Sequence, residues 1–229
     1  MADISTARRQ VFVTGGTGFL GRRLVAELVA RGHIVNALAR PGSEKKLPLG
    51  CRTVIGDALD KSSYAARVPP ADTFVQLIGV THPSPAKAEE FRVIDAASAR
   101  AGIGAAVDAR VAHFVYVSVA QPAPVMQSYV TARAECEQLL RASGLAATIL
   151  RPWYVLGPGR QWPRLLMPVY WILERLPATS ESAQRLGLLT IDQMIAALTN
   201  AVENPSPGIR VLGVPEIRQA KFTGASQTA

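Results

Sequence analysis

The sequence predicts an α/β protein with a parallel, doubly wound sheet and a small C-terminal lid region. Strand-like and helix-like segments alternate along residues 11–150, as they do when crossover helices connect parallel strands. The chain has 229 residues, 48% of them apolar, which is enough for one sizeable core. Beyond Arg151 the alternation stops, and prolines interrupt the chain. We therefore expect a core at residues 1–151, a lid region at 152–218 packed on the core, and a mobile tail at 219–229.

The first predicted unit is a short apolar strand at Val11–Val13, followed by a glycine cluster and a helix. The helix begins near Phe19, carries an apolar stripe and ends at Gly32. The glycines fit two spacings, G-x-G-x-x-G at 16, 18 and 21 and G-x-x-G-x-x-G at 15, 18 and 21. Glycine permits a tight turn and a close approach of the backbone to a phosphate, while a helix N-terminus offers unpaired N–H groups.

This unit therefore predicts a bound dinucleotide. The expected binding residues are Gly15, Thr17, Gly18, Phe19, Leu20 and Gly21. The alternative is a glycine turn that binds no ligand.

The remaining units follow in order. Strands are expected at His33–Ala39, Arg52–Ile55, Thr73–Ile78, His113–Val119 and Thr148–Leu150. Helices are expected at Ala86–Arg110, with an interruption at Gly102 and Gly104, and at Ser128–Ala142. Ligands of such sheets bind beyond the carboxyl ends of the strands.

The C-terminal part predicts one amphipathic helix with Ile191 and Val202 on its apolar face, then a short strand at Ile209–Val214. Before it, the apolar segment Leu165–Leu173 is too short to span a bilayer. It could pack on the core, cover an apolar substrate, contact a partner subunit or touch a membrane surface. The sequence leaves these alternatives open.

The composition of the chain limits the classes of partner and ligand that it is expected to bind. The net charge is +8, but the basic residues are scattered and only 6% of residues are aromatic, which favours a solvated basic surface over a nucleic-acid site. Cys51 and Cys136 form no paired motif, so neither a metal site nor a disulfide is expected. The N-terminus has no apolar signal core and no apolar stretch has the length of a membrane span, so we expect a cytoplasmic protein.

The end of the second strand bears on the choice of dinucleotide. A free ribose 2′-hydroxyl is usually met there by Asp or Glu, whereas an arginine suits a 2′-phosphate. Here the strand ends at Arg40, no acidic residue occurs between Glu27 and Glu44, and Arg22 could add a second cation. The sequence thus favours NADP over NAD. Alternatively, Arg40 is an ordinary surface residue.

Several motifs together resemble the short-chain dehydrogenase/reductase superfamily, in particular its extended and atypical members. The motifs are Thr14-Gly-Gly-Thr-Gly-Phe-Leu-Gly21, Gly56-Asp57, Val75-Gln-Leu-Ile-Gly79, Phe114-Val-Tyr-Val-Ser118 and Leu150-Arg-Pro-Trp-Tyr-Val-Leu-Gly-Pro158. The resemblance covers residues 10–204 and implies a Rossmann-type fold.

The same resemblance places further residues along the cofactor. Asp57 and Ala58 would lie by the adenine, Gly79 by the adenosine or the central ribose, and Pro152, Tyr154 and Val155 by the nicotinamide. Two of these residues also have a local alternative, because Asp57 could cap a turn and Pro152 could end a strand.

The catalytic groups of that superfamily are a serine after the fifth strand and Tyr-x-x-x-Lys on the next helix. This sequence has Ser118 and then Tyr129-Val-Thr-Ala-Arg133, so the spacing is kept and the lysine is replaced. Positions i and i+4 share a helix face, and Tyr129 and Arg133 could both point into the cofactor cleft. A tyrosine with an ordinary pKa of about 10 needs a nearby cation to exchange a proton near neutral pH. Arginine keeps the charge but is not equivalent to lysine as a clamp on the nicotinamide ribose.

Three functions follow as alternatives. The first is an NADP-dependent oxidoreductase or epimerase-type enzyme acting on a small, apolar carbonyl or alcohol. The second is a non-catalytic regulator or assembly subunit that binds NADP(H). The third is a membrane-surface or respiratory-assembly protein. The sequence determines neither the substrate nor the oligomeric state.

Overall fold

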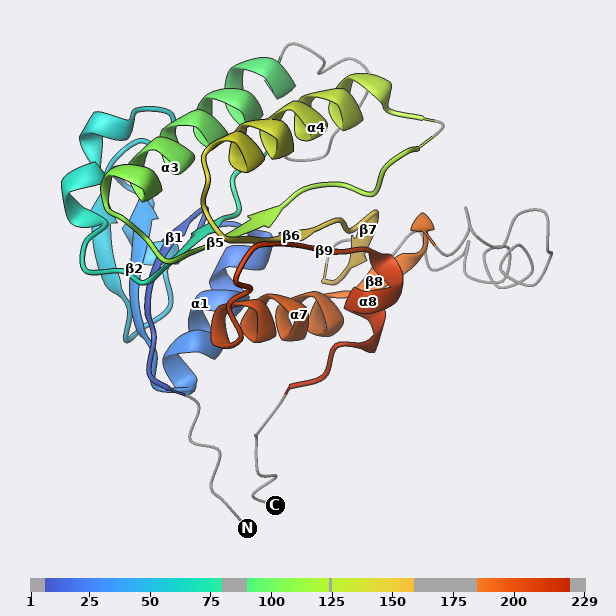
Figure 1. The fold of residues 1–229 in the computed structure, drawn as a ribbon. Coiled ribbons are helices and arrows are strands. Elements are labelled where there is room, and N and C mark those ends of the chain that lie inside the picture. Colours follow the sequence, from blue (N-terminus) through green and yellow to red (C-terminus); the bar gives the residue numbers. More distant parts are fainter. Residues whose placement is uncertain (1–6, 80–89, 124, 159–184, 223–229) are drawn as a thin grey trace, which may run out of the picture.

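The computed structural model describes residues 7–79, 90–123, 125–158 and 185–222, and its centre is a sheet of seven parallel strands (Figure 1). The strand order is β3 (Arg52–Ile55), β2 (Ile34–Ala39), β1 (Gln10–Thr14), β4 (Thr73–Gln76), β5 (His113–Val117), β6 (Ala147–Leu150) and β9 (Ile209–Leu212). The parallel, doubly wound sheet predicted from the sequence is therefore confirmed. Its order reverses between β1 and β4, and in such sheets this switch point is where a ligand binds.

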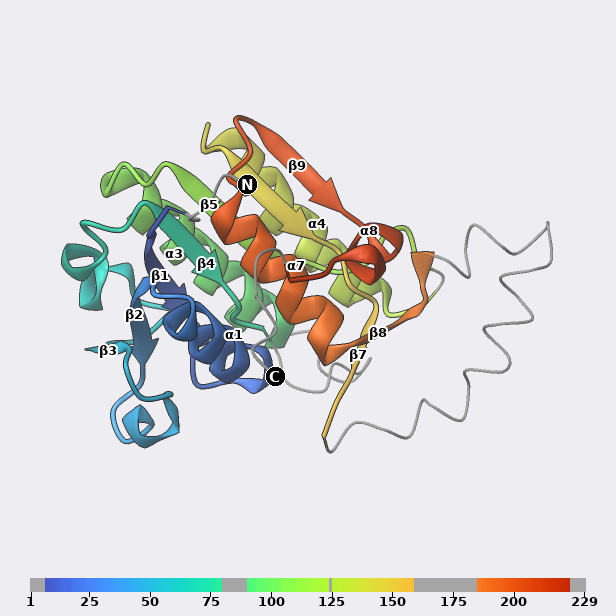
Figure 2. The ribbon, with the colours of Figure 1, turned by 90° about the horizontal axis from the view of Figure 1, so that it is seen from below.

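Helices cover both faces of the sheet. One face carries α1 (Phe19–Ala30), α7 (Ile191–Glu203) and the short α8 (Val214–Gln219), and Figure 2 looks onto this face. The other face carries α3 (Ala97–Asp108) and α4 (Gln127–Ala142). A π-helical turn, η5 (Phe91–Ala96), leads into α3, and three short 3-10 turns lie at Glu44–Lys46, Lys61–Ser63 and Ala65–Arg67.

The inner strands β1, β4, β5 and β6 are buried because each side chain faces one helical layer or the other. Val11, Val13 and Val75 belong to the cluster that contacts α1 and α7. Phe12 and Phe74 point to the opposite face, where their rings stack with centroids 5.3 Å apart. The alternation of side chains along a strand thus fills two separate cores from one sheet.

The predicted break of the long helix is wrong in position. The helix α3 runs through Gly102 and Gly104, and the change of geometry occurs earlier, where η5 ends at Ala96. A Cβ at position 102 would lie 2.8 Å from Oε1 of Gln76, so glycine here permits close packing of α3 on β4. Residues 86–89, where we expected the helix to begin, lie outside the described residues.

The C-terminal part contains two elements that the sequence analysis did not predict. The last strand ends at Leu212, and Val214, expected in that strand, instead begins α8. A second, two-stranded parallel sheet joins β7 (Tyr154–Leu156) to β8 (Leu188–Thr190). The apolar segment Leu165–Leu173 and the tail beyond residue 222 lie outside the described residues.

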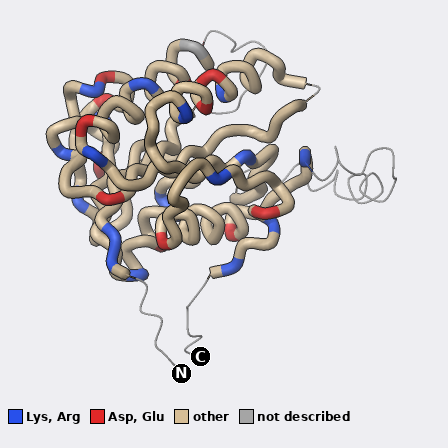
Figure 3. The backbone as a smooth tube through the Cα atoms, in the orientation of Figure 1, with Lys and Arg blue, Asp and Glu red and all other residues tan. Residues whose placement is uncertain are grey.

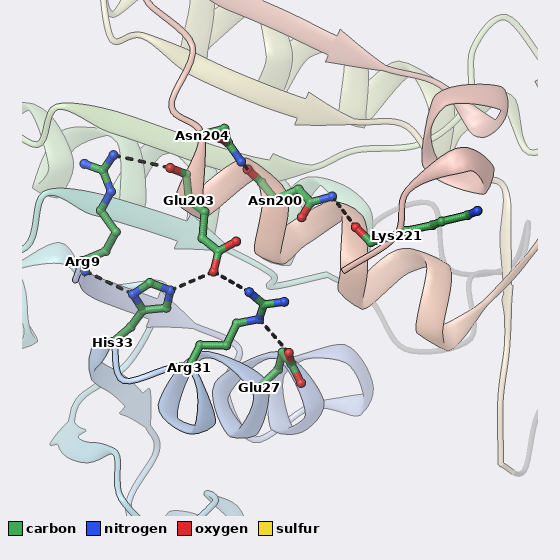
Figure 4. A network of polar contacts seen from close by, with 8 residues as sticks. All are labelled: Arg9, Glu27, Arg31, His33, Asn200, Glu203, Asn204 and Lys221. Atoms are coloured by element: carbon green, nitrogen blue, oxygen red, sulfur yellow. Dashed lines mark hydrogen bonds and ion pairs between the residues drawn. The ribbon is translucent and has the colours of Figure 1, made fainter. Parts of the chain in front are cut away.

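A buried polar network ties the end of α1 to the end of α7 (Figure 4). The carboxylate of Glu203 is fully buried and accepts a 2.9 Å hydrogen bond from Nη1 of Arg31, with Nε2 of His33 at 3.3 Å. His33 uses its other ring nitrogen to accept from the backbone N–H of Arg9, and it lies just before β2 instead of beginning it. Removing one partner of such a buried pair typically costs about 3–5 kcal/mol, so this network fixes the two helices to each other.

Charged residues are spread over the described part of the chain. Along the backbone tube of Figure 3, Lys and Arg positions are interspersed with Asp and Glu positions over several elements. Among the helices that the structure describes, none combines the length and the apolar character that crossing a bilayer requires.

Candidate functional site

The glycine loop after β1 is closed tightly. Gly15 has a φ of +74°, a left-handed conformation that favours glycine, and its carbonyl accepts a 3.0 Å hydrogen bond from the N–H of Gly18. A Cβ on Gly21 would collide with that carbonyl, so α1 can begin this close to the strand only because Gly21 lacks one. The first turn of α1 therefore lies directly over the carboxyl end of β1, as a phosphate-binding helix does.

A cavity of about 460 Å³ opens next to this loop, beyond the carboxyl ends of β1, β2, β3 and β4. Seven of the predicted cofactor residues line it: Gly15, Thr17, Gly18, Arg40, Asp57, Ala58 and Gly79. The other lining residues are Leu38, Gly56, Leu59, Leu77, Ile78, Glu90 and Ile94.

Arg40 and Asp57 lie at the end of the cavity formed by β2 and β3. Arg40 is exposed directly after β2. Oδ1 of Asp57 accepts a 3.0 Å hydrogen bond from the N–H of Leu59, so this side chain caps its own turn, as the local alternative predicts. Asp57 nevertheless lines the cavity as well.

The other seven predicted cofactor residues do not line this cavity. Four belong to the first turn of α1: Phe19, Leu20, Gly21 and Arg22. The ring of Phe19 lies under the Arg23 guanidinium at 5.0 Å, Leu20 contacts the core, and Arg22 is exposed. The remaining three follow β6: Pro152, Tyr154 and Val155. Pro152 is buried and its carbonyl accepts from the N–H of Ala120, while Tyr154 and Val155 are half-buried in β7.

The guanidinium of Arg133 is enclosed by protein groups. Nη1 donates to Oη of Tyr116 at 3.1 Å and to the carbonyl of Val117 at 2.9 Å, while Nη2 donates to the carbonyl of Ile78 at 3.4 Å. Nε lies 3.4 Å from Oδ2 of the fully buried Asp95. Burial alone would lower the pKa of Arg133, but Tyr116, Tyr129 and Asp95 raise it well above its ordinary value, so the guanidinium stays charged.

Tyr129 lies beside this cation, one turn earlier on α4. The Arg133 guanidinium carbon is 5.4 Å from the centroid of the Tyr129 ring, and Phe91 contacts the same ring with centroids 5.0 Å apart. The two residues are therefore neighbours, as their spacing predicts. Neither of them lines the cavity, but Gly79 does, and a Cβ on Gly79 would collide with Nη2 of Arg133.

Ser118 follows β5 and is buried. Its Oγ has no hydrogen-bond partner among the described residues, so no hydrogen bond joins it to Tyr129. Of the three predicted catalytic residues, Ser118 thus follows β5, and Tyr129 and Arg133 are in contact on α4.

Sequence reasoning missed Asp95, Glu90 and Ile94. All three belong to η5 or immediately precede it, and nothing in the sequence pattern marks a π-helical turn. Leu38 could have been found, because it lies in β2 two residues before Arg40, and alternation along an extended chain returns side chains to the same face.

A comparison with family models identifies the family of the chain. The model of an NAD(P)H-binding family matches residues 15–161, which include the glycine loop, both tyrosine neighbours of Arg133 and the start of the segment after β6. The chain belongs to this NAD(P)H-binding family. The resemblance inferred from the motifs is thereby confirmed at the level of the family.

Relatives of this NAD(P)H-binding protein include named reductases. The 3-diazoavenalumate denitrifying reductase of a Streptomyces species is 30% identical, over 87% of this chain and 74% of that protein. The ceramide reductase of Caulobacter vibrioides is 28% identical, over 97% of this chain and 68% of that protein. Among solved structures, the Bordetella bronchiseptica enzyme WbmH in complex with NAD+ superposes with a TM-score of 0.67 at 20% identity, covering 90% of this chain and 76% of that one. At that identity the likeness shows the fold.

Proposed function

We propose that this NAD(P)H-binding protein is an NADP(H)-dependent reductase of a small, apolar carbonyl compound. The observation that carries the proposal is the contact between Tyr129 and Arg133, whose guanidinium lies beside Gly79, a residue of the cavity lining. A phenol beside a charged guanidinium is suited to donate a proton to a carbonyl oxygen as that oxygen becomes negative.

The residues present fit a dinucleotide. A Cβ at Gly21 would collide with the carbonyl of Gly15, and a Cβ at Gly15 would lie 3.0 Å from the backbone of Leu77. Glycine at both positions therefore permits the close packing that would bring the N-terminus of α1 to the pyrophosphate position. Leu38, Ala58 and Leu59 offer apolar surface for a base at the far end of the cavity. When bound, the reduced dinucleotide supplies the hydride.

Each protein group then has one role in the proposed reaction. Tyr129 holds the proton that goes to the carbonyl oxygen, and Arg133 stabilises the tyrosinate that remains. Ser118, whose Oγ lacks a partner among the described residues, would donate a hydrogen bond to the same oxygen. The aldehyde or ketone thereby becomes an alcohol, with the hydride on carbon and the proton on oxygen.

Arg40 supports NADP as the preferred dinucleotide. It is exposed, lines the cavity directly after β2, and is the only Arg or Lys among the described lining residues. A guanidinium there suits a 2′-phosphate. Asp57, a carboxylate of the same cavity lining, already accepts the hydrogen bond of its own turn.

Two observations support an apolar compound as the substrate. One relative is named a ceramide reductase, and a ceramide is an apolar molecule. Trp153 and Val155, in the segment that the family resemblance places by the nicotinamide, are partly buried and pack against an apolar cluster. An apolar compound fits such surroundings better than a sugar nucleotide does.

The direct test has two stages. Thermal-shift titration with NADPH and with NADH should give the larger stabilisation with NADPH, and NADPH should then be oxidised in the presence of some members of a panel of long-chain and aromatic aldehydes and ketones. A preference for NADH of about tenfold or more, equal to about 1.4 kcal/mol, would contradict the NADP assignment.

One observation favours a second candidate function. The charge of Arg133 is already balanced by Asp95, which weakens its effect on Tyr129. We therefore also propose, as the alternative, a regulator or assembly subunit in which the dinucleotide sets conformation. It predicts tight NADPH binding with no oxidation by any carbonyl in the panel.

A further inference from the structure

One face of α4 carries three polar side chains at intervals of four residues: Tyr129, Arg133 and Glu137. Arg133 reaches the ends of two strands, because it donates to the carbonyls of Ile78 after β4 and Val117 at the end of β5. Glu137, one turn later, is directed at the next strand end. The face of α4 thus contacts the carboxyl ends of β4, β5 and β6.

Glu137 is a buried carboxylate with three close donors. Its Oε1 accepts from Nε of Arg151 at 2.9 Å and from Nε2 of Gln121 at 2.7 Å, and its Oε2 accepts from Nη2 of Arg151 at 2.6 Å. The Glu137 side chain is 3% exposed. Two parallel, charge-assisted bonds fix both the distance and the plane of the Arg151 guanidinium, which a single bond would not do.

The two residues that donate these bonds come from different segments. Gln121 belongs to the segment after β5, which contains Ser118, and Arg151 belongs to the segment after β6, which leads into Tyr154. A backbone bond already holds these segments side by side beyond the ends of the strands: the N–H of Ala120 donates to the carbonyl of Pro152 at 2.9 Å. Glu137 therefore joins a pair of segments to the helix that carries Tyr129.

None of these residues lines the dinucleotide cavity. Gln121, Glu137 and Arg151 lie on the β5–β6 side, whereas the cavity is formed by the ends of β1 to β4 together with Glu90 and Ile94. A change at Glu137 should therefore affect the substrate side of the site and leave the dinucleotide side unaltered.

We infer that Glu137 is a positioning residue for the reducing site: it holds the segments 118–121 and 151–155 at a fixed distance from Tyr129. The part of this inference that concerns substrate turnover rests on the proposed function. The part that concerns the order of the segment 151–155 does not depend on that function.

The kinetic test compares Glu137→Gln, Arg151→Lys and a matched control, Arg141→Gln. Arg141 is the more exposed neighbour of the same carboxylate, with Nη2 at 3.9 Å from Oε2. For Glu137→Gln we expect kcat/KM for the carbonyl to fall about 10- to 100-fold, since a displacement of about 1 Å can cost this much, while the NADPH dissociation constant changes less than about twofold. Arg151→Lys, which keeps the charge and loses the second bond, should give a smaller loss, and Arg141→Gln should give none.

A second readout does not require turnover. The chain has three tryptophans, and in a Trp162→Phe, Trp171→Phe background Trp153, two residues after Arg151, is the remaining one. Adding Glu137→Gln to this background should increase the quenching of Trp153 fluorescence by acrylamide, and Arg141→Gln should not.

Two results would overturn the inference. One is unchanged quenching and unchanged kcat/KM in Glu137→Gln. The other is a loss of NADPH affinity as large as the loss of kcat/KM, which would indicate a general structural role. If the wild-type protein oxidises no NADPH with any carbonyl, the proposed reductase function fails, and the quenching comparison alone decides whether Glu137 orders the segment.

Discussion

The Nε atom of Arg133 lies 3.4 Å from Oδ2 of Asp95, and both side chains are inside the protein. A buried guanidinium is costly unless a counter-charge and hydrogen-bond acceptors surround it. Asp95 supplies the charge, and Tyr116 and the ends of β4 and β5 supply the acceptors. Arg133, which stands where the superfamily motif has lysine, is therefore part of a fixed cluster. Its guanidinium needs the space that Gly79, which has no side chain, leaves open.

Replacing Gly79 by alanine should destabilise the protein. The new Cβ would meet Nη2 of Arg133, and the guanidinium cannot move without leaving Asp95 and the two strand carbonyls. Overpacking of this kind costs about 1–3 kcal/mol, and we expect the melting temperature to fall by several degrees. Gly208→Ala is the matched control, because nothing lies within 4 Å of a Cβ there. Equal melting temperatures for the two variants would show that Arg133 is free to move.

Replacing Tyr129 by phenylalanine removes the proposed proton donor and keeps the ring that contacts Phe91 and Arg133. Turnover should fall about 100-fold or more, with NADPH affinity nearly unchanged, because Tyr129 does not line the dinucleotide cavity. Stopped-flow oxidation of NADPH and a binding titration measure the two quantities. Tyr64→Phe serves as the control, since Tyr64 is a buried tyrosine of the core on the α3 face. A fully active Tyr129→Phe variant would exclude this mechanism.

Replacing Arg40 by glutamine should weaken NADPH binding selectively. A hydrogen bond to a charged group contributes about 1.5–3 kcal/mol, so we expect the NADPH dissociation constant to rise about 10- to 100-fold and that of NADH to stay nearly constant. Isothermal titration calorimetry with both dinucleotides measures the ratio. Lys45→Gln, in the loop that follows Arg40 and outside the cavity lining, should change neither constant. Parallel losses for NADPH and NADH would mean that Arg40 does not contact the 2′-phosphate.

The sequence predicts the parts of this fold that depend on local patterns. The glycine loop, the strand β1 and the helix α1 follow from residue type and spacing within twenty residues, and the structure has them. The contact between Tyr129 and Arg133 also follows from their spacing of four residues on one helix. These features need no information about distant segments.

Other features depend on tertiary contacts that no local pattern encodes. Gly102 suggests a helix break, but the close approach of α3 to Gln76 makes glycine suitable there. Asp95 looks like an ordinary helical residue until the chain folds back to place Arg133 beside it. The pairing of β7 with β8 joins residues more than thirty positions apart, and three-residue strands carry almost no periodicity.

His113 predicts a pH dependence of stability. It lies at the start of β5, fully buried, with Nε2 3.1 Å from Oγ1 of Thr148 and with no partner for Nδ1 among the described residues. Burial, with smaller contributions from Arg210 and Arg9, lowers the pKa of His113 from 6.5 to about 4. The folded protein therefore keeps this ring neutral under conditions in which the unfolded chain protonates it.

Between about pH 6.5 and about pH 4, the unfolded state binds a proton at His113 that the folded state does not bind, so the free energy of unfolding falls as the pH falls through this window. The loss should reach about 2–3 kcal/mol near pH 4 and grow no further below it, because the folded protein then binds the proton too. Urea unfolding of the wild type and of His113→Gln, at several pH values across the window, isolates this contribution as the difference between the two curves. The variant should lose less stability on acidification than the wild type does. Curves that stay parallel from neutral pH to about pH 4 would show that His113 is protonated in the folded protein as readily as in the unfolded chain.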